Sequence, residues 1–190
     1  MSRYLTHVVR LRDAAAHLVL LLERIDPLLG ARKLGPLLWQ LPPTFRRDDD
    51  RLAQALAELP RTLRHAFEFR HESWFAPEVL ELLRSHGVAL VIADRPEIRG
   101  FQTHELTADF TFVRFHHGTR GQRGNYSDSE LDDWAGRIGA WSQRVDVYGY
   151  FNNDWEGFAP RNALGLKDRL GLESIDVAGA HPGRAHGHRS

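Results

Sequence analysis

The chain has 190 residues, which is enough for one domain with a real hydrophobic core. Lysine plus arginine and aspartate plus glutamate each number 25, so the formal net charge is zero, which argues against a general binder of nucleic acids or anionic membranes. Cysteine is absent, which excludes disulfides, thiolate zinc sites and cysteine nucleophiles.

Apolar periodicity and turn residues predict alternating helices and strands along most of the chain. A first helix is predicted at 14–25, capped by Asp13 and ended by Pro27. The predicted strands are 37–41, 66–70, 88–93, 110–116 and 145–151. The predicted helices between and after them run from Asp48–Asp50 to a residue before Pro60, and then at 77–86, 127–143 and 159–170. Loops are expected at 95–108 and 117–126, and the alternation predicts a parallel sheet covered by helices.

Each predicted strand has one apolar face and one face that becomes polar towards its C-terminal end, because side chains alternate along a strand. The polar positions on these shared faces are Gln40, Glu68, Arg70, Asp94, Arg114, His116 and Asn152. The opposite faces are expected to pack beneath helices, and they include Phe67, Phe69, Val91, Val113 and Val147. Enzymes with parallel sheets or barrels place their chemistry at the C-terminal ends of the strands, so we expect a functional site there.

The residue types suggest roles in such a site. Arg70 and Arg114 can clamp a carboxylate or phosphate with forked hydrogen bonds. The candidate catalytic acid–base groups are Glu68, Asp94 and His116. The remaining candidate substrate-binding side chains are Gln40, Asn152 and Asn153, which can orient a substrate through neutral hydrogen bonds.

Two other interpretations of these residues remain open. The pairs Glu68/Arg70 and Asp94/Arg114 can equally be internal ion pairs that hold the mouth of the sheet together. Glu68, Asp94 and His116 are also suitable metal ligands, but no closely spaced ligand motif accompanies them, so we assign no metal site and no cofactor.

Several segments of the chain together resemble the YecE-like family, also called domain of unknown function 72 (DUF72). The matching segments are residues 35–43 (GPLLWQLPP), 67–74 (FEFRHESW), 108–110 (ADF), 113–116 (VRFH), 126–127 (YS) and 150–153 (YFNN). The resemblance covers roughly residues 1–170 and implies a TIM-type (β/α) barrel of unestablished activity. It also implies that Ser2–His7 corresponds to the end of a third barrel strand, so that Met1 is not the ancestral start.

The fold expected on both grounds is therefore a partial TIM-type barrel of class α/β, with about five of the eight strand–helix units of a complete barrel. It should occupy residues 1–171, followed by a disordered tail at 172–190 that is rich in His, Gly and Ala. An incomplete barrel leaves the strand at 37–41 unpaired on one side, and such an edge favours self-association.

The expected function is that of an enzyme, or a fragment of one, that binds a small anionic substrate, although the sequence leaves open whether it is an enzyme at all. The alternatives are a non-catalytic ligand-binding protein, a nucleic-acid-binding protein and an inactive, truncated gene product. We expect a cytoplasmic protein without a membrane span, because the longest apolar run, Leu18–Leu22, is too short to cross a bilayer. The N-terminal residues 1–4 also lack the features of a signal peptide.

Overall fold

A computed structural model of the chain describes residues 4–12, 14–31, 33–94 and 103–172. The predicted tail, from residue 173 onwards, and part of the predicted loop at 95–108 lie outside these residues. The strands are β1 (Leu37–Gln40), β2 (His65–Glu68), β3 (Ala89–Asp94), β4 (Phe110–Phe115) and β5 (Asp146–Phe151). The helices are α1 (Ala14–Gly30), α2 (Asp49–Glu58), α3 (Pro77–Ser85), α4 (Asp128–Ser142) and α5 (Phe158–Arg169), and a short π-helical segment, Tyr4–Val8, precedes α1.

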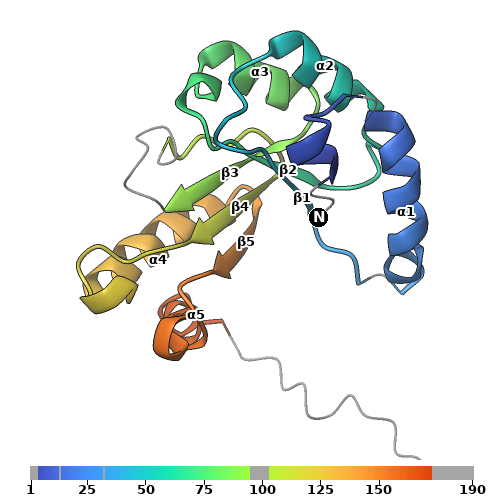
Figure 1. Ribbon diagram of the computed structural model, residues 1–190. Helices are drawn as coiled ribbons and strands as arrows, with labels where there is room; N and C mark the ends of the chain where they lie inside the picture. Colours follow the sequence, from blue (N-terminus) through green and yellow to red (C-terminus); the bar gives the residue numbers. More distant parts are fainter. Residues whose placement is uncertain (1–3, 13, 32, 95–102, 173–190) are drawn as a thin grey trace, which may run out of the picture.

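The five strands form one parallel sheet in the order β1-β2-β3-β4-β5, which is also their order in the sequence. The sheet curls into part of a barrel, with the helices on its outer side (Figure 1). The predicted α/β partial barrel is thereby confirmed. No helix in the described part of the chain is long and apolar enough to cross a membrane.

The helix boundaries follow the predicted capping residues with one exception. Asp48 accepts a hydrogen bond from the Arg51 backbone at the start of α2, and Ser127 forms a capping box with Glu130 at the start of α4. Helix α1, however, continues through Pro27 to Gly30, so the predicted end at Pro27 is wrong. The fixed φ of proline is compatible with a helix, and proline removes only one backbone hydrogen bond there.

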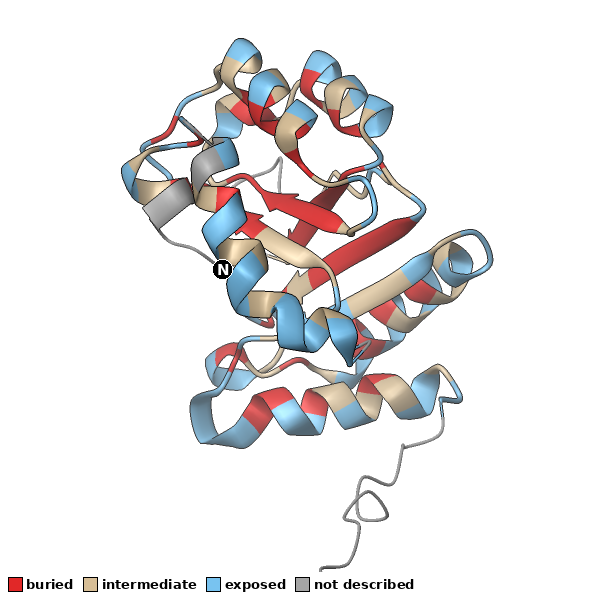
Figure 2. Cartoon of the chain, turned by 90° about the vertical axis from the view of Figure 1, so that its right-hand side faces the viewer, coloured by how far each residue is buried: buried red, intermediate tan, exposed pale blue. Residues whose placement is uncertain are grey.

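Two hydrophobic clusters fill the space between the sheet and the helices, and the three central strands, β2, β3 and β4, are the most deeply buried elements (Figure 2). Phe67 and Phe69 belong to the cluster on the side of α2 and α3, and Val113 and Val147 pack in the cluster beneath α4 and α5. A third cluster lies on the inner, concave face of the sheet and contains no helix residue among its members. The predicted outer-face positions of these four residues are confirmed.

Strand β3 has the opposite orientation to the one predicted. Leu90 and Ile92 belong to the two clusters on the helix side, whereas Val91 belongs to the cluster on the inner face. The prediction for Val91 was wrong because residues 88–93 are apolar without interruption, so the sequence has no alternation that could reveal which face is which.

Candidate functional site

The polar residues of four strands meet at the C-terminal ends of the sheet, and Glu68 is their common partner. The register of β1 and β2 places Gln40 directly beside Glu68. The Gln40 side-chain amide donates a hydrogen bond of 2.8 Å to Glu68 Oε2. The Glu68 side chain is only 1% exposed, so its charge depends on partners from the protein.

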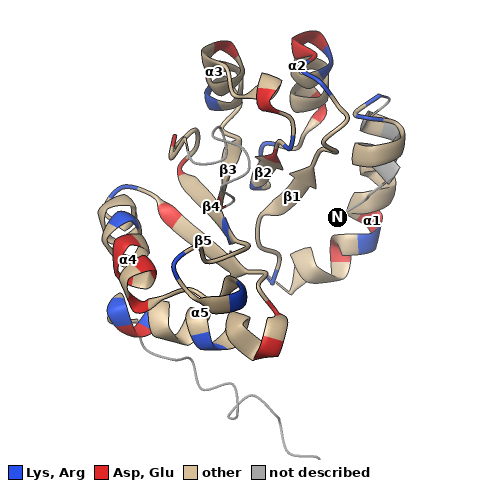
Figure 3. Cartoon of the chain, turned by 60° about the vertical axis from the view of Figure 1, so that its left-hand side comes forward, with Lys and Arg blue, Asp and Glu red and all other residues tan. Residues whose placement is uncertain are grey.

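Two arginines supply those partners. The Arg70 Nε atom donates to Glu68 Oε1 at 3.1 Å, and Arg114 on β4 forms an ion pair with Glu68 Oε2. Arg114 also donates from Nε and Nη2 to the Asn152 side-chain oxygen, at 3.2 and 3.0 Å, just beyond the end of β5. Figure 3 shows that the strands are otherwise largely without charge, and that charged residues gather on the helices and at strand ends. We call Gln40, Glu68, Arg70, Arg114 and Asn152 the arginine cluster.

Arg114 reaches Glu68 across the whole width of β3, and its neighbour on β3 has only a small side chain. Ala93 is the register partner of Arg114 and lies between β2 and β4. Because β3 presents its odd-numbered residues to the inner face, the methyl group of Ala93 stands there instead of Ile92 or Asp94. The reversed orientation of β3 is therefore a condition for the arginine cluster.

Glu68 is ionised in this arrangement. Burial alone would raise the pKa of its carboxyl group, but the charge of Arg114, the hydrogen bond from Gln40 and the charge of Arg70 outweigh that effect. The resulting pKa lies below the usual range for glutamate. The arginine cluster contains one carboxylate, that of Glu68, and two guanidinium groups, those of Arg70 and Arg114, so it carries one net positive charge.

Asp94 does not join the arginine cluster, contrary to the prediction. Its carboxylate accepts a hydrogen bond of 3.1 Å from the Trp134 indole of α4, on the outer side of the sheet. Burial raises the pKa of Asp94, and the contacts with Tyr126 and Trp134 offset only part of that effect. The Asp94/Arg114 ion pair considered from the sequence is likewise absent from the described structure, because Arg114 pairs with Glu68.

Asn153 is also in a different place from the one expected of a substrate-binding residue. It is 6% exposed, and its side-chain amide donates to the Gly124 carbonyl at 3.1 Å and to the Asn162 side chain at 2.8 Å. These bonds tie the end of β5 to the loop after β4 and to α5. His116 follows β4 two residues after Arg114 and is half-buried, and it keeps its position at this end of the sheet.

The role of Glu130 in organising the glycine-rich loop at 117–126 was not predicted from the sequence. One carboxylate oxygen accepts from the backbone N–H groups of Thr119 and Arg120, at 2.6 and 3.0 Å, and the other accepts from Ser127. Burial alone would raise the pKa of Glu130, but these backbone hydrogen bonds lower it to about 2. The predicted capping box was a partial signal, since it placed Glu130 beside Ser127 but not beside the loop.

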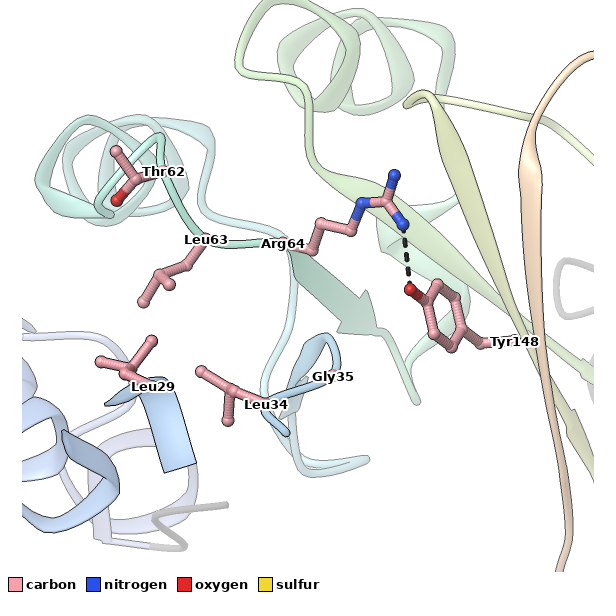
Figure 4. Close-up of a pocket in the computed structure, with 7 residues that line it drawn as sticks. All are labelled: Leu29, Leu34, Gly35, Thr62, Leu63, Arg64 and Tyr148. Carbon is pink, nitrogen blue, oxygen red and sulfur yellow. Dashed lines mark hydrogen bonds between the residues drawn. The ribbon is translucent and has the colours of Figure 1, made fainter. Parts of the chain in front are cut away.

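Two hollows of the described structure lie away from the arginine cluster, one beside Arg64 and one between β5, α4 and α5. One pocket of about 360 Å³ lies at the N-terminal ends of the strands, between Leu29, Leu34 and Leu63 on one side and Arg64 and Tyr148 on the other (Figure 4). The Arg64 guanidinium donates to the Tyr148 hydroxyl at 2.9 Å, as Figure 4 shows, and pairs with Asp146 at 2.6 Å. Its charge is thus already neutralised. No group of three or more potential metal ligands occurs among the described residues.

The sequence profile of the family described as protein of unknown function DUF72 matches residues 1–186. The chain belongs to the DUF72 family. A solved DUF72 family protein from Thermotoga maritima is 30% identical, with a TM-score of 0.77 over 89% of this chain and 71% of that chain.

A DUF72 family protein from Enterococcus faecalis is 24% identical, with a TM-score of 0.74 over 90% of this chain and 70% of that chain, and it supports the fold alone. No curated protein matches the chain. The DUF72 comparisons establish the family and the partial barrel, and they name no activity.

Proposed function

We propose that the arginine cluster binds the phosphate or carboxylate group of a small molecule. The observation that carries this proposal is the excess of one positive charge at a half-buried place on the inner face, at the C-terminal ends of the strands. The side chains of Arg70 and Arg114 are 25% and 14% exposed, so both remain within reach of a ligand while most of their surface is shielded from water.

The two arginines differ in how many donors are already used. All three guanidinium nitrogens of Arg114 already donate hydrogen bonds, to Glu68 and to Asn152. Arg70 uses only Nε, and its two terminal nitrogens donate to no other residue in the described part of the chain. A guanidinium with both terminal nitrogens available matches the two oxygens of a carboxylate or phosphate. Arg70 is therefore the primary contact for the anion, and Arg114 supplies the supporting charge.

Glu68 and His116 take different parts in this proposal. A carboxylate kept ionised by two guanidinium groups is a weak proton acceptor, so Glu68 acts as a positioning residue that aims Arg70 and Arg114. If the bound molecule is also converted, His116 is the acid–base group, because it follows Arg114 by two residues at the same end of the sheet. Gln40 and Asn152 orient the charged pair from its two sides.

Isothermal titration with inorganic phosphate and with acetate tests the binding step. We expect saturable binding of at least one of these anions by the full chain, and a loss of affinity of about 10- to 100-fold in Arg70→Gln, as for a lost charged hydrogen bond. The matched control is Arg84→Gln on α3, since Arg84 pairs only with surface carboxylates far from the cluster. Equal affinities for the wild type, Arg70→Gln and Arg84→Gln would rule out the proposed site.

A further inference from the structure

His65 is the first residue of β2, and both nitrogens of its ring have partners in other segments of the chain. The residue is only 3% exposed and lies on the same strand face as Phe67. The Trp39 indole of β1 donates a hydrogen bond of 3.0 Å to His65 Nδ1. His65 Nε2 lies 3.0 Å from the Pro60 carbonyl oxygen, in the loop between α2 and β2. His65 therefore links β1, β2 and the α2–β2 loop.

These partners determine the protonation state of His65. An indole N–H group can only donate, so His65 Nδ1 must accept from Trp39 and carries no proton. A backbone carbonyl can only accept, so His65 Nε2 must carry the proton that it shares with Pro60. Only the neutral ring that is protonated at Nε2 satisfies both hydrogen bonds.

We propose that His65 acts as a pH-sensitive latch, in which the neutral ring holds Trp39 and the doubly protonated ring releases it. A second proton on the ring must bind at Nδ1, which would turn the N–H group of the imidazolium towards the N–H group of the indole. Two donors then face each other without an acceptor. The hydrogen bond to Pro60 survives this change, so the contact that is lost is the one between β2 and the Trp39 side chain of β1.

The loss of this hydrogen bond requires Trp39 to move. Trp39 is 2% exposed and belongs to the hydrophobic cluster on the side of α2 and α3. Water therefore does not reach its indole N–H group to replace His65 Nδ1, and a buried donor without a partner is costly. The indole must shift until it finds another acceptor. Protonation of His65 is thus converted into a displacement of a core side chain.

The charged groups around His65 do little to stabilise a cation there. Burial is the main cause that lowers the pKa of His65, and the hydrogen bond to the Pro60 carbonyl opposes it only in part. Strand β1 presents the neutral Trp39 ring. The ionisable residues that line a hollow of about 350 Å³ beside His65 are Arg61, His86 and Asp109. Asp109 is the one carboxylate among them, and its side chain is 79% exposed, so water screens its charge.

The direction of the pKa change gives the pH range of the latch. The pKa of His65 is lowered from its usual value of 6.5. The stability that the neutral ring contributes is therefore complete above pH 6.5 and is lost as the pH falls through the lower folded value. The latch is closed at neutral pH and opens in acid.

Long-range proton–nitrogen NMR spectra of the full chain test this inference, recorded from about pH 8 to about pH 4 because histidine titrates within that range. We expect His65 to be protonated only at Nε2 at neutral pH, and the Trp39 indole signal to change together with the His65 signals as the pH falls. A His65 ring that carries its proton at Nδ1 at neutral pH would overturn the proposal. So would a Trp39 indole signal that stays constant while His65 titrates.

The variant Trp39→Phe tests the part that the indole plays. It removes the donor that opposes the second proton, so His65 should titrate at a higher pH than in the wild type. Trp74→Phe is the matched control, because it removes a buried indole of the same cluster that donates to the Phe45 carbonyl and to no histidine. Equal titration of His65 in the two variants would contradict the proposal.

A second variant keeps the test decisive if Trp39→Phe does not fold. In His65→Asn the side-chain oxygen takes the place of Nδ1 as an acceptor and does not titrate. The Trp39 indole signal should then stay constant over the same pH range, in contrast to the wild type. An indole signal that changes with pH in His65→Asn as it does in the wild type would overturn the latch.

Discussion

Glu68 and Asp94 occupy the same place on neighbouring strands, the last residue of β2 and the last residue of β3, yet they have opposite properties. Glu68 points to the inner face, is paired with two arginines and has a lowered pKa. Asp94 points beneath α4, accepts a hydrogen bond from the Trp134 indole and has a raised pKa, chiefly because it is buried. The comparison teaches that the strand face, and not the position at the strand end, decides which carboxylate joins the arginine cluster.

The largest expected effect is the loss of Glu68. Glu68→Ala leaves two guanidinium groups at a shielded place without their counter-charge, which should lower the free energy of unfolding by about 3–5 kcal/mol. Urea denaturation followed by circular dichroism measures this change. Glu81→Ala on α3 is the matched control, because Glu81 is exposed and its ion pair with Arg84 is long, at 3.6 Å. A Glu68→Ala protein as stable as Glu81→Ala would show that the arginines do not depend on Glu68.

A medium effect is expected at Ala93, on the strand that separates Arg114 from Glu68. Ala93→Leu fills the space through which Arg114 reaches Glu68, and overpacking of this kind costs about 1–3 kcal/mol. The variant should also lose phosphate or carboxylate affinity, because Arg114 is displaced from the arginine cluster. Ala57→Leu, on an exposed position of α2, is the control and should change stability by less than about 0.5 kcal/mol. Unchanged affinity in Ala93→Leu would contradict the role given to Ala93.

The smallest effect is a difference in pH dependence, and its sign distinguishes the two carboxylates. The stability that Glu68 contributes is present above its unfolded pKa of 4.5 and is lost as the pH falls through its lower folded value. For Asp94 the folded pKa is the higher one, so its contribution is present below 3.8 and is lost as the pH rises through the folded value.

Glu68→Gln should therefore be less stable than the wild type at neutral pH, and Asp94→Asn should be more stable. Both differences should shrink as the pH falls. Urea midpoints at intervals from about pH 7 to about pH 3 measure the two difference curves. Curves of the same sign would mean that the strand face does not determine the charge state.

The sequence predicted the strands closely, because turn residues bound them. Prolines frame the strand at 37–41, and the capping box at Ser127 marks the start of α4. Gln40, Glu68 and Arg70 were placed correctly on one face, since β1 and β2 alternate between apolar and polar residues. Strand β3 does not alternate, so the same reasoning failed for Asp94 and Val91.

The contact between Arg114 and Glu68 could not be predicted from the sequence for a different reason. It depends on the order of three strands and on the register between them, which places Ala93 at the crossing point. Asn153 was misjudged because its partners, Gly124 and Asn162, lie in a loop and a helix whose relative placement no local pattern reveals.

The hydrogen bonds from the loop after β4 to Glu130 have a consequence for any phosphate that approaches this loop. Its carboxylate occupies the backbone donors of Thr119 and Arg120, which is the kind of concave donor arrangement that elsewhere receives a phosphate group. The loop therefore carries an anion of its own, because the carboxylate of Glu130, the third residue of α4, fills the position that an external phosphate would have to take. The backbone donors of this loop are thus already satisfied from within the chain, and the proposed anion site depends on side chains such as Arg70 instead.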